Sequence, residues 1–145
     1  MRISPTFRLA ILLAGAVLTA GYIGLRQFTN SICSLDVIRR MPSPDGRFEA
    51  VLFQRNCGAT TNFATNLSIT RSGSTISNAP GNLLVADSDH GRAPLDSGYV
   101  VRVTVRWVTP DSVIVHYDSR AHVYKQSMRA HGVSVAYQPL AGGGA

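Results

Sequence analysis

Charged and aromatic residues are both scarce in this chain of 145 residues. Charged residues make up 15% and aromatic residues 8%, whereas hydrophobic residues make up 45%. So large an apolar fraction excludes a disordered chain, and no stretch repeats with the period of a solenoid or a coiled coil. The length is that of one domain of ordinary size, which argues against a multidomain enzyme.

The chain also lacks a concentrated patch of basic residues. Its formal net charge is +6, from 14 basic and 8 acidic residues, but Arg2, Arg8 and Arg26 flank an apolar N-terminal segment. From Gln27 onward there are 11 basic and 8 acidic residues, a balance of +3. The arginines of this part are scattered along it, so the sequence predicts no nucleic-acid partner.

Motifs for catalysis and for metal or cofactor binding are absent as well. The sequence contains no phosphate-binding loop, no catalytic-triad signature and no pair of acidic residues suited to acid–base chemistry. Its four histidines lack the spacing of a zinc site; they are His90, His116, His122 and His131. We therefore predict no catalytic residue, no metal and no cofactor.

One acidic segment deserves comparison with a calcium loop. Asp87 and Asp89 alternate, and His90 follows them, so hard-metal ligands lie close together in the sequence. An EF-hand loop also needs a bidentate acidic residue at a fixed downstream position, and Asp96 alone does not supply that pattern. A solvated loop is the favoured interpretation.

The longest apolar run extends from Leu9 to Leu25, seventeen residues without a charge between Arg8 and Arg26. As a helix this run would be about 25 Å long, and snorkelling of the two arginines would extend it across a hydrocarbon core of about 30 Å. A transmembrane anchor is therefore predicted. A cleaved signal peptide is the alternative, for which Thr19-Ala20-Gly21 offers small residues but no clean cleavage site follows.

Two cysteines in a small domain behind an export-type segment are typical of an oxidising compartment, which places the domain outside the cytoplasm. The predicted organisation is a cytoplasmic segment at 1–8, a transmembrane anchor or signal peptide at 9–25, a linker at 26–33, an extracytoplasmic β domain at 34–139 and a flexible tail at 140–145.

Beyond residue 33 the periodicity is mainly that of β-strands. From Val101 to Trp107, apolar side chains alternate with Arg102, Thr104 and Arg106, which gives one apolar and one cationic face. Clusters of Gly, Pro, Asn and Asp separate seven further predicted strands: Leu35 to Met41, Arg47 to Arg55, Asn66 to Arg71, Leu83 to Ala86, Val113 to Tyr117, His122 to Ser127 and Val133 to Tyr137. The predicted fold class is mainly β, a small antiparallel sheet curled into a sandwich or partial barrel after a single N-terminal transmembrane helix.

The segment at residues 43–47, Ser-Pro-Asp-Gly-Arg, sets the register of the first hairpin. A three-residue Pro-Asp-Gly loop with its glycine in the left-handed region pairs the flanking serine and arginine. Residues whose numbers sum to 90 then face each other, so Val37 lies opposite Phe53 and Cys33 opposite Cys57. We predict a disulfide between Cys33 and Cys57.

A second hairpin is predicted around residues 109–112, Thr-Pro-Asp-Ser. Alternation of apolar residues favours a register with a sum of 222, which sets Trp107 against Val115. On the polar face this register places Arg106 beside His116 and Thr104 beside Asp118.

The most distinctive string is Cys-Gly-Ala-Thr-Thr at residues 57–61. Together with the Ser-Pro-Asp-Gly turn, it resembles a widespread family of small, uncharacterised bacterial proteins that are membrane-anchored or exported. The resemblance extends through Gly81-Asn82, Val105 to Val108 and Val133 to Tyr137, and so covers most of the predicted domain. It implies a fold and a location but no reaction. The implied location is the bacterial inner membrane, with a single pass and the domain facing the periplasm or the cell exterior.

Cys57 has a second interpretation as a nucleophile. Gly58 would allow close approach of a substrate, and the hydroxyls of Thr60 and Thr61 or nearby backbone N–H groups would stabilise an oxyanion. One of the four histidines would have to act as the base, and the sequence places none of them nearby. The disulfide is the favoured interpretation.

These observations favour a non-enzymatic, membrane-anchored extracytoplasmic domain that acts by protein contact or as an envelope accessory factor. Its predicted partners are the membrane, through Leu9 to Leu25, and a protein that the sequence does not identify. A small thiol-dependent enzyme centred on Cys57 and an immunity-type inhibitor of an exported toxin are the alternatives.

Overall fold

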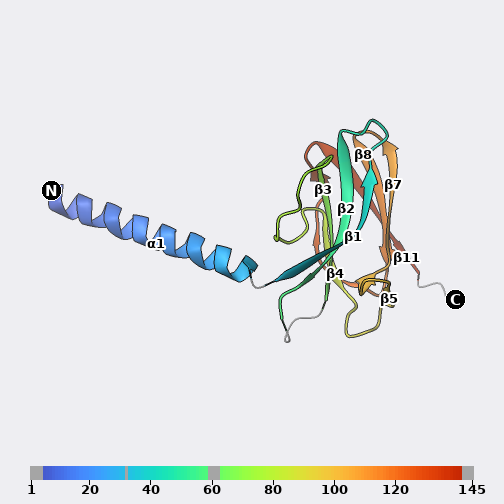
Figure 1. The fold of residues 1–145 in the computed structure, drawn as a ribbon, viewed down its shortest axis with the longest axis horizontal. Helices are drawn as coiled ribbons and strands as arrows, with labels where there is room; N and C mark the ends of the chain where they lie inside the picture. The colour runs from blue at the N-terminus through green and yellow to red at the C-terminus, as the bar shows by residue number, and fades with distance from the viewer. Residues whose placement is uncertain (1–4, 32, 59–62, 142–145) are drawn as a thin grey trace. The chain divides into compact units, whose positions relative to one another are not determined.

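The computed structural model describes residues 5–31, 33–58 and 63–141, and the chain divides into two compact units between Ile32 and Cys33. The first unit contains the helix α1 (Pro5–Ser31), and the second contains the strands (Figure 1). The helix is longer than the predicted segment 9–25 and occupies most of the predicted linker 26–33. Arginine and glutamine end the apolar run at Arg26 and Gln27, but they are good helix formers, so the helix continues through them.

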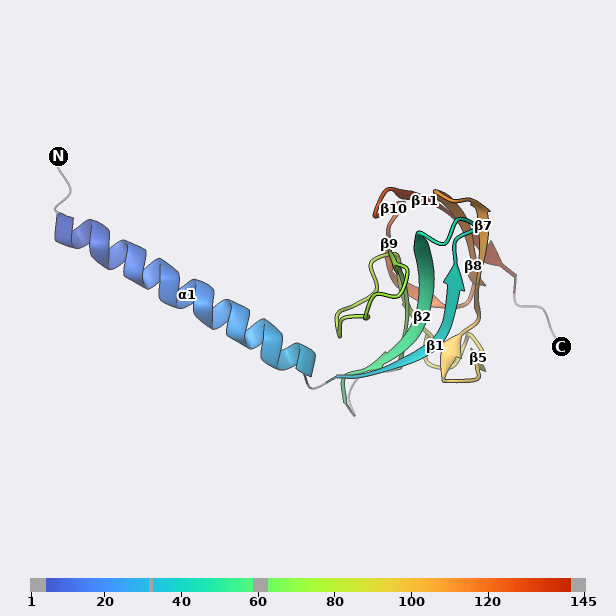
Figure 2. The same cartoon turned by 45° about the horizontal axis from the view of Figure 1, so that its top comes forward.

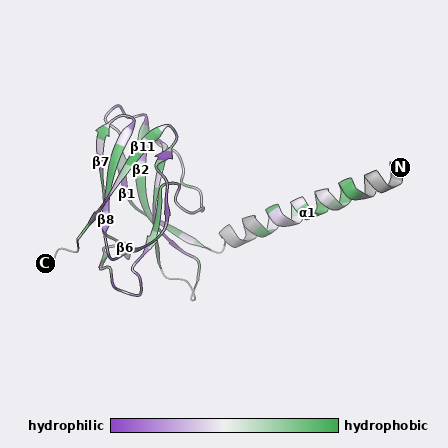
Figure 3. Cartoon of the chain, turned by 180° about the vertical axis from the view of Figure 1, so that it is seen from behind, coloured by the Kyte–Doolittle hydropathy of each residue, from purple (hydrophilic) through white to green (hydrophobic). Residues whose placement is uncertain are grey.

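Large apolar side chains of α1 are exposed between Ile11 and Leu25, with exposed fractions from 50% to 75%. Figure 3 shows the hydrophobic colouring of this part of the helix. Within the described residues, no helix reaches the combination of length and hydropathy that crossing a membrane requires. The structure thus confirms a helix at the apolar run without showing it to be a membrane span.

The second unit has a strand at each of the eight predicted places. These strands are β1 (Ser34–Pro42), β2 (Phe48–Asn56), β3 (Ala64–Arg71), β4 (Leu84–Asp87), β7 (Val103–Thr109), β8 (Ser112–Asp118), β9 (His122–Gln126) and β11 (Val133–Leu140). The structure adds the two-residue strands β5 (Leu95–Asp96), β6 (Val100–Val101) and β10 (Arg129–Ala130). Because Leu140 belongs to β11, the predicted tail at 140–145 is part strand, and its residues 142–145 lie outside the described residues.

The strands form two main sheets that pack against each other as a sandwich (Figure 2). One sheet has the order β1-β2-β3-β4-β9 and the other the order β10-β11-β8-β7. Apolar side chains from both sheets fill the space between them, among them Leu52, Leu67, Leu84, Val103, Val113 and Val135. The mainly β prediction is confirmed, and the sandwich is the form that the fold takes.

One strand pair departs from the predicted antiparallel arrangement. Strands β8 and β11 run parallel, with Val113 opposite Val135. The chain leaves β8, passes through β9 in the other sheet and returns through β10, so it re-enters beside β8 in the same direction. Such a crossover between sheets leaves no local pattern in the sequence.

The first hairpin has the predicted pairing at its open end and a different pairing near its turn. Val37 lies opposite Phe53, as predicted, but Ser43 pairs with Phe48, one residue further than predicted. The hydroxyl of Ser43 accepts a hydrogen bond from the Phe48 N–H at 3.0 Å, which stabilises the longer loop. The longer loop shifts the pairing by one residue, and a bulge at Ile38 shifts it back. The prediction included neither the longer loop nor the bulge, and because their effects cancel, the open end has the predicted register.

The second hairpin is displaced by two residues from the predicted register. Trp107 lies opposite Val113 rather than Val115, because the loop at 109–112 is shorter than predicted and Val108 forms a bulge. A displacement by an even number of residues leaves each side chain on its predicted face of the sheet. The predicted faces are therefore right although the predicted partners are wrong.

The predicted strand from Val101 to Trp107 is interrupted at Arg102. The Val101 N–H donates to the hydroxyl of Thr65 at 2.7 Å, which draws this part of the chain toward the five-stranded sheet. Val101 is buried and Arg102 exposed, as the alternation predicts, but Trp107 is only partly buried. The Trp107 indole donates to the carbonyl oxygen of Met41 at 3.1 Å and so connects the two sheets.

A loop of residues 72–83 covers the outer face of the five-stranded sheet. Val51 and Phe53 point away from the sandwich core and are nevertheless buried. The side-chain amide of Asn82 bonds to the N–H and the C=O of Ile69 at 2.9 and 2.8 Å, as a neighbouring strand would. An asparagine amide thus attaches the loop to the sheet.

Gly81 lies where this loop makes its closest approach to the sheet. A Cβ atom at this position would lie 2.7 Å from the backbone oxygens of Leu67 and Leu84. Because those oxygens belong to neighbouring strands, they cannot move aside without disturbing the sheet. A side chain at residue 81 is therefore excluded by backbone packing.

The substitution Gly81→Ala should lower the free energy of unfolding by at least about 2 kcal/mol, because the added methyl group overpacks the sheet. The control Ser72→Ala changes an exposed residue of the same loop and should cost less than about 0.5 kcal/mol. Urea unfolding of both variants measures the difference. Equal and small effects would contradict the close approach at Gly81.

Candidate functional site at the disulfide end

A disulfide joins Cys33, directly before β1, to Cys57, directly after β2. The Cα atoms of the two cysteines are 4.0 Å apart, and the register continues from Ser34 opposite Asn56. The Asn78 amide donates to the carbonyl oxygen of Cys33, so the covering loop is attached at the same point. The predicted disulfide is confirmed. We call this part of the domain, with the segment 87–99 and the turn 118–121, the disulfide end.

The nucleophile interpretation of Cys57 does not agree with this bond. A nucleophilic cysteine reacts as a thiolate, whereas a disulfide sulfur carries no titratable proton. The described residues include no free cysteine. Thr60 and Thr61, the predicted oxyanion donors, lie outside the described residues.

Cys33→Ser and Cys57→Ser should each lower the free energy of unfolding by about 3.5 kcal/mol, because either change opens the same loop of the unfolded chain. The sequence separation of the two cysteines is 24. The double variant should be no less stable than either single variant, since the bond is lost only once. Thermal unfolding of the three variants under non-reducing conditions makes the comparison. A single variant with an unchanged Tm would contradict the structural role.

The segment 87–93 is a tight turn held by hydrogen bonds. The buried carboxylate of Asp87 accepts bonds from the Tyr124 hydroxyl at 2.6 Å and from the Asp89 N–H at 2.8 Å. The bond to Asp87 is the largest cause that raises the pKa of Tyr124. Asp89 also pairs with Arg92 at 3.0 Å. In the described part of the chain, no three His, Cys, Asp or Glu side chains are placed to hold a metal ion.

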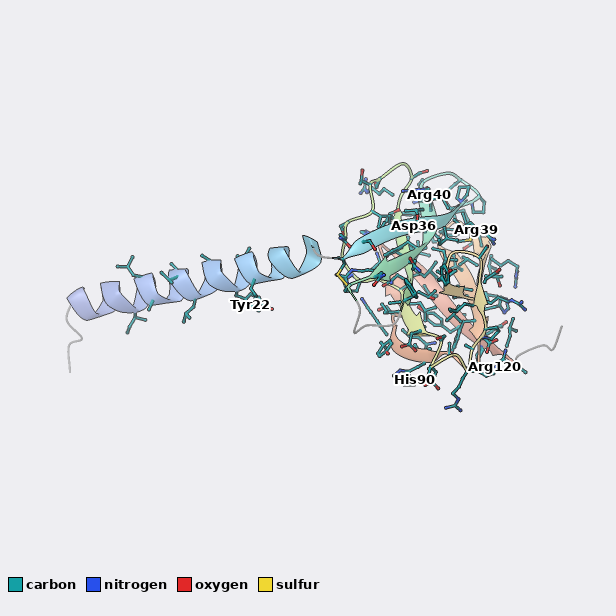
Figure 4. All side chains as sticks on the ribbon, turned by 60° about the horizontal axis from the view of Figure 1, so that its bottom comes forward. Tyr22, Asp36, Arg39, Arg40, His90 and Arg120 are labelled. Carbon is teal, nitrogen blue, oxygen red and sulfur yellow. A yellow bond between two sulfur atoms is a disulfide. The ribbon has the colours of Figure 1, made fainter. Side chains whose placement is uncertain are left out.

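The four histidines are spread over the domain. His90 is exposed in the turn, and Figure 4 shows it at the same end of the domain as Arg120. His122 begins β9 with its ring 4.4 Å from that of Tyr124. His116 lies in β8, and His131 lies in the turn between β10 and β11. The structure therefore does not gather them into one site.

Two exposed aromatic rings stack on each other at the disulfide end. The ring centroids of Phe63 and Tyr99 are 5.2 Å apart, and the two residues are 39% and 63% exposed. Tyr99 has a φ of 54°, a left-handed conformation that is costly for a bulky residue. We call these two residues the aromatic pair.

A cavity of about 320 Å³ opens on the outer face of the four-stranded sheet. The cavity is lined by residues of three neighbouring segments: Arg102 directly before β7, Thr104 in β7, His116, Tyr117 and Asp118 in β8, and Leu140 and Ala141 at the end of β11. The Nδ1 atom of His116 is buried and has no hydrogen-bond partner among the described residues. We call this cavity the cationic pocket.

Arg120 neutralises the carboxylate of the cationic pocket. Its guanidinium donates to both oxygens of Asp118 at 2.9 and 2.8 Å, and its backbone N–H donates at 2.9 Å. The side-chain bonds from Arg120 are the main cause that lowers the pKa of Asp118 to about 2; burial opposes this shift, and the charge of Arg102 adds to it. The five ion pairs of the described residues do not include Arg102. The pocket thus retains one uncompensated positive charge.

The lowered pKa of Asp118 predicts a loss of stability in acid. A carboxyl group whose pKa is lower in the folded than in the unfolded state stabilises the fold above its unfolded value of 3.8, and this contribution disappears as the pH falls toward about 2. Arg120→Gln should raise the folded pKa and reduce the loss of unfolding free energy between pH 5 and pH 2. Asp45, whose pKa Arg47 lowers to about 2, gives the same background in both proteins. Identical pH profiles would contradict the assignment.

The sequence predicted a cationic face but not this pocket. Because the register differs by two residues, Thr104 lies beside His116, and Arg106 lies beside Ile114. Arg120 and Leu140 were missed, since one lies in a turn and the other in the predicted tail. No sequence pattern connects these two residues with the cationic face.

No family model, no curated protein and no solved structure matches the chain. The resemblance to small bacterial membrane-anchored or exported proteins therefore stays a prediction, and the site has to be interpreted from its own geometry.

Proposed function

We propose that this protein is a non-enzymatic binding domain of the bacterial cell envelope, attached to the outer side of the inner membrane by α1, and that it acts by contact with a partner protein. An immunity-type inhibitor of an exported toxin is one form of such a role. The aromatic pair is the observation that carries the proposal of a protein contact.

Support for export comes from the sequence and from the disulfide. The run Leu9 to Leu25 has no charge and is flanked by Arg8 and Arg26, as in a signal anchor. A disulfide between Cys33 and Cys57 persists in an oxidising compartment and is rare in the cytoplasm of mesophilic bacteria. Both features are those of a domain that folds outside the cytoplasm.

Support for a protein contact comes from the exposure and the backbone strain of the aromatic pair. Tyrosine and phenylalanine are enriched at the centres of protein interfaces, where they bury large areas at low cost in side-chain entropy. Tyr99 keeps a strained backbone while its side chain stays mostly exposed, and strain of this kind concentrates at functional positions. Stacking on Phe63 holds the exposed ring in place before a partner binds.

A topology reporter tests the export part of the proposal. A reporter that is active only outside the cytoplasm should be active when fused after Ala145 in the full-length chain. A reporter that is active only inside should be inactive at the same position. Export would be contradicted if the reporter that is active only inside the cytoplasm were active when fused after Ala145.

Site-specific photo-crosslinking in living cells tests the protein contact. A photo-crosslinking amino acid at position 99 should give one discrete crosslinked species, and the yield should fall when Phe63→Ala removes the stacking partner. The control position is Met128, near the opposite end of the domain and with a similar exposed fraction, 66% against 63% for Tyr99. The same species from both positions, or none from position 99, would contradict a contact through the aromatic pair.

A further inference from the structure

We propose that the cationic pocket binds a carboxylate that carries a small apolar group. The pocket is separate from the aromatic pair, and the inference does not depend on the proposed partner contact. It rests on the charge of the pocket, on the donors that line it and on its apolar wall.

The charge of the pocket favours an anionic ligand. Among the lining residues Arg102 is positively and Asp118 negatively charged. Arg120, which does not line the cavity, cancels the charge of Asp118 through bonds to both of its oxygens. Arg102 is exposed and belongs to none of the ion pairs among the described residues. Its guanidinium is therefore available to a ligand, and it presents the planar fork of N–H donors that a carboxylate accepts.

The neighbouring polar groups fit a monoanion. Thr104 follows Arg102 on the same face of the sheet, so its hydroxyl supplies a second donor, and His116 lies opposite Thr104 across the strand pair. A phosphate dianion would bring two negative charges to one uncompensated arginine, which leaves one of those charges without a partner. The observations therefore favour a single carboxylate.

The rest of the pocket is apolar. Leu140 and Ala141 form one side, and the ring of Tyr117 contributes to the wall. A volume of about 320 Å³ is at the lower end of the range for small-molecule sites, so the apolar part of the ligand is small. Two sources offer this chemistry, namely a free short-chain acid and the C-terminus of a peptide that ends in an aliphatic residue.

Isothermal titration calorimetry on the full-length protein tests the proposal with four probes. These are isovalerate, the peptide acetyl-Gly-Gly-Val with a free carboxylate, the same peptide with a C-terminal amide, and inorganic phosphate. At least one of the two acids should bind, and the amide should bind at least about tenfold more weakly than the acid peptide or not at all, because it lacks the charge that Arg102 recognises. If the acid peptide binds more tightly than isovalerate, the ligand is a peptide C-terminus. If isovalerate binds more tightly, the ligand is a free short-chain acid.

Two arginine variants supply the matched control. Arg102→Gln should weaken binding of the acids at least about tenfold, whereas Arg71→Gln, which removes an equal charge from an exposed residue at the other end of the domain, should leave binding unchanged. Both residues are exposed, so both variants should keep the wild-type Tm, which is measured in parallel. Three results would overturn the proposal: no binding of either acid, measurable binding of the acid and amide peptides with equal affinity, or tighter binding of inorganic phosphate than of both acids.

Discussion

The disulfide between Cys33 and Cys57 fixes the open end of the β1–β2 hairpin, and the rest of the domain is assembled on that hairpin. Strand β2 is buried on both faces, by the sandwich core on one side and by the covering loop on the other. Asn78 connects this loop to the carbonyl oxygen of Cys33. A covalent bond at the edge of the sheet therefore holds in register the strand on which both layers depend.

The two ends of the sandwich differ in how their charges are satisfied. At the end that contains the turns of the first and second hairpins, opposite the disulfide end, Arg47 pairs with Asp45 in the first turn and with Asp111 in the second. These two ion pairs link the turns. At the disulfide end, Arg120 satisfies Asp118, but Arg102 remains available and the aromatic pair stays exposed. The disulfide end presents both a charge and an apolar surface that a ligand or a partner would complete.

Alternation of apolar and polar residues predicted the strand from Val101 to Trp107, and strand-like segments between clusters of Gly, Pro, Asn and Asp predicted the places of the seven other longer strands. The disulfide was also predicted, although through two errors that cancel, the longer loop at Ser43 and the bulge at Ile38. Bulges depend on contacts with other strands, so the register of a hairpin cannot be read from its turn alone. The cationic pocket was missed for a different reason. The parallel pairing of β8 with β11 brings Leu140 beside Asp118, and the crossover that produces this pairing leaves no local pattern in the sequence.

The fold and the proposed export both depend on the oxidised state of the two cysteines in the protein as cells make it. One sample of full-length protein is denatured and treated with a thiol-reactive label without reduction, a second is reduced first and then labelled, and both are analysed by intact mass. We expect no labelled cysteine in the unreduced sample and two in the reduced sample. Two labelled cysteines in the unreduced protein would contradict both the disulfide as the anchor of the fold and the export on which the proposed function rests.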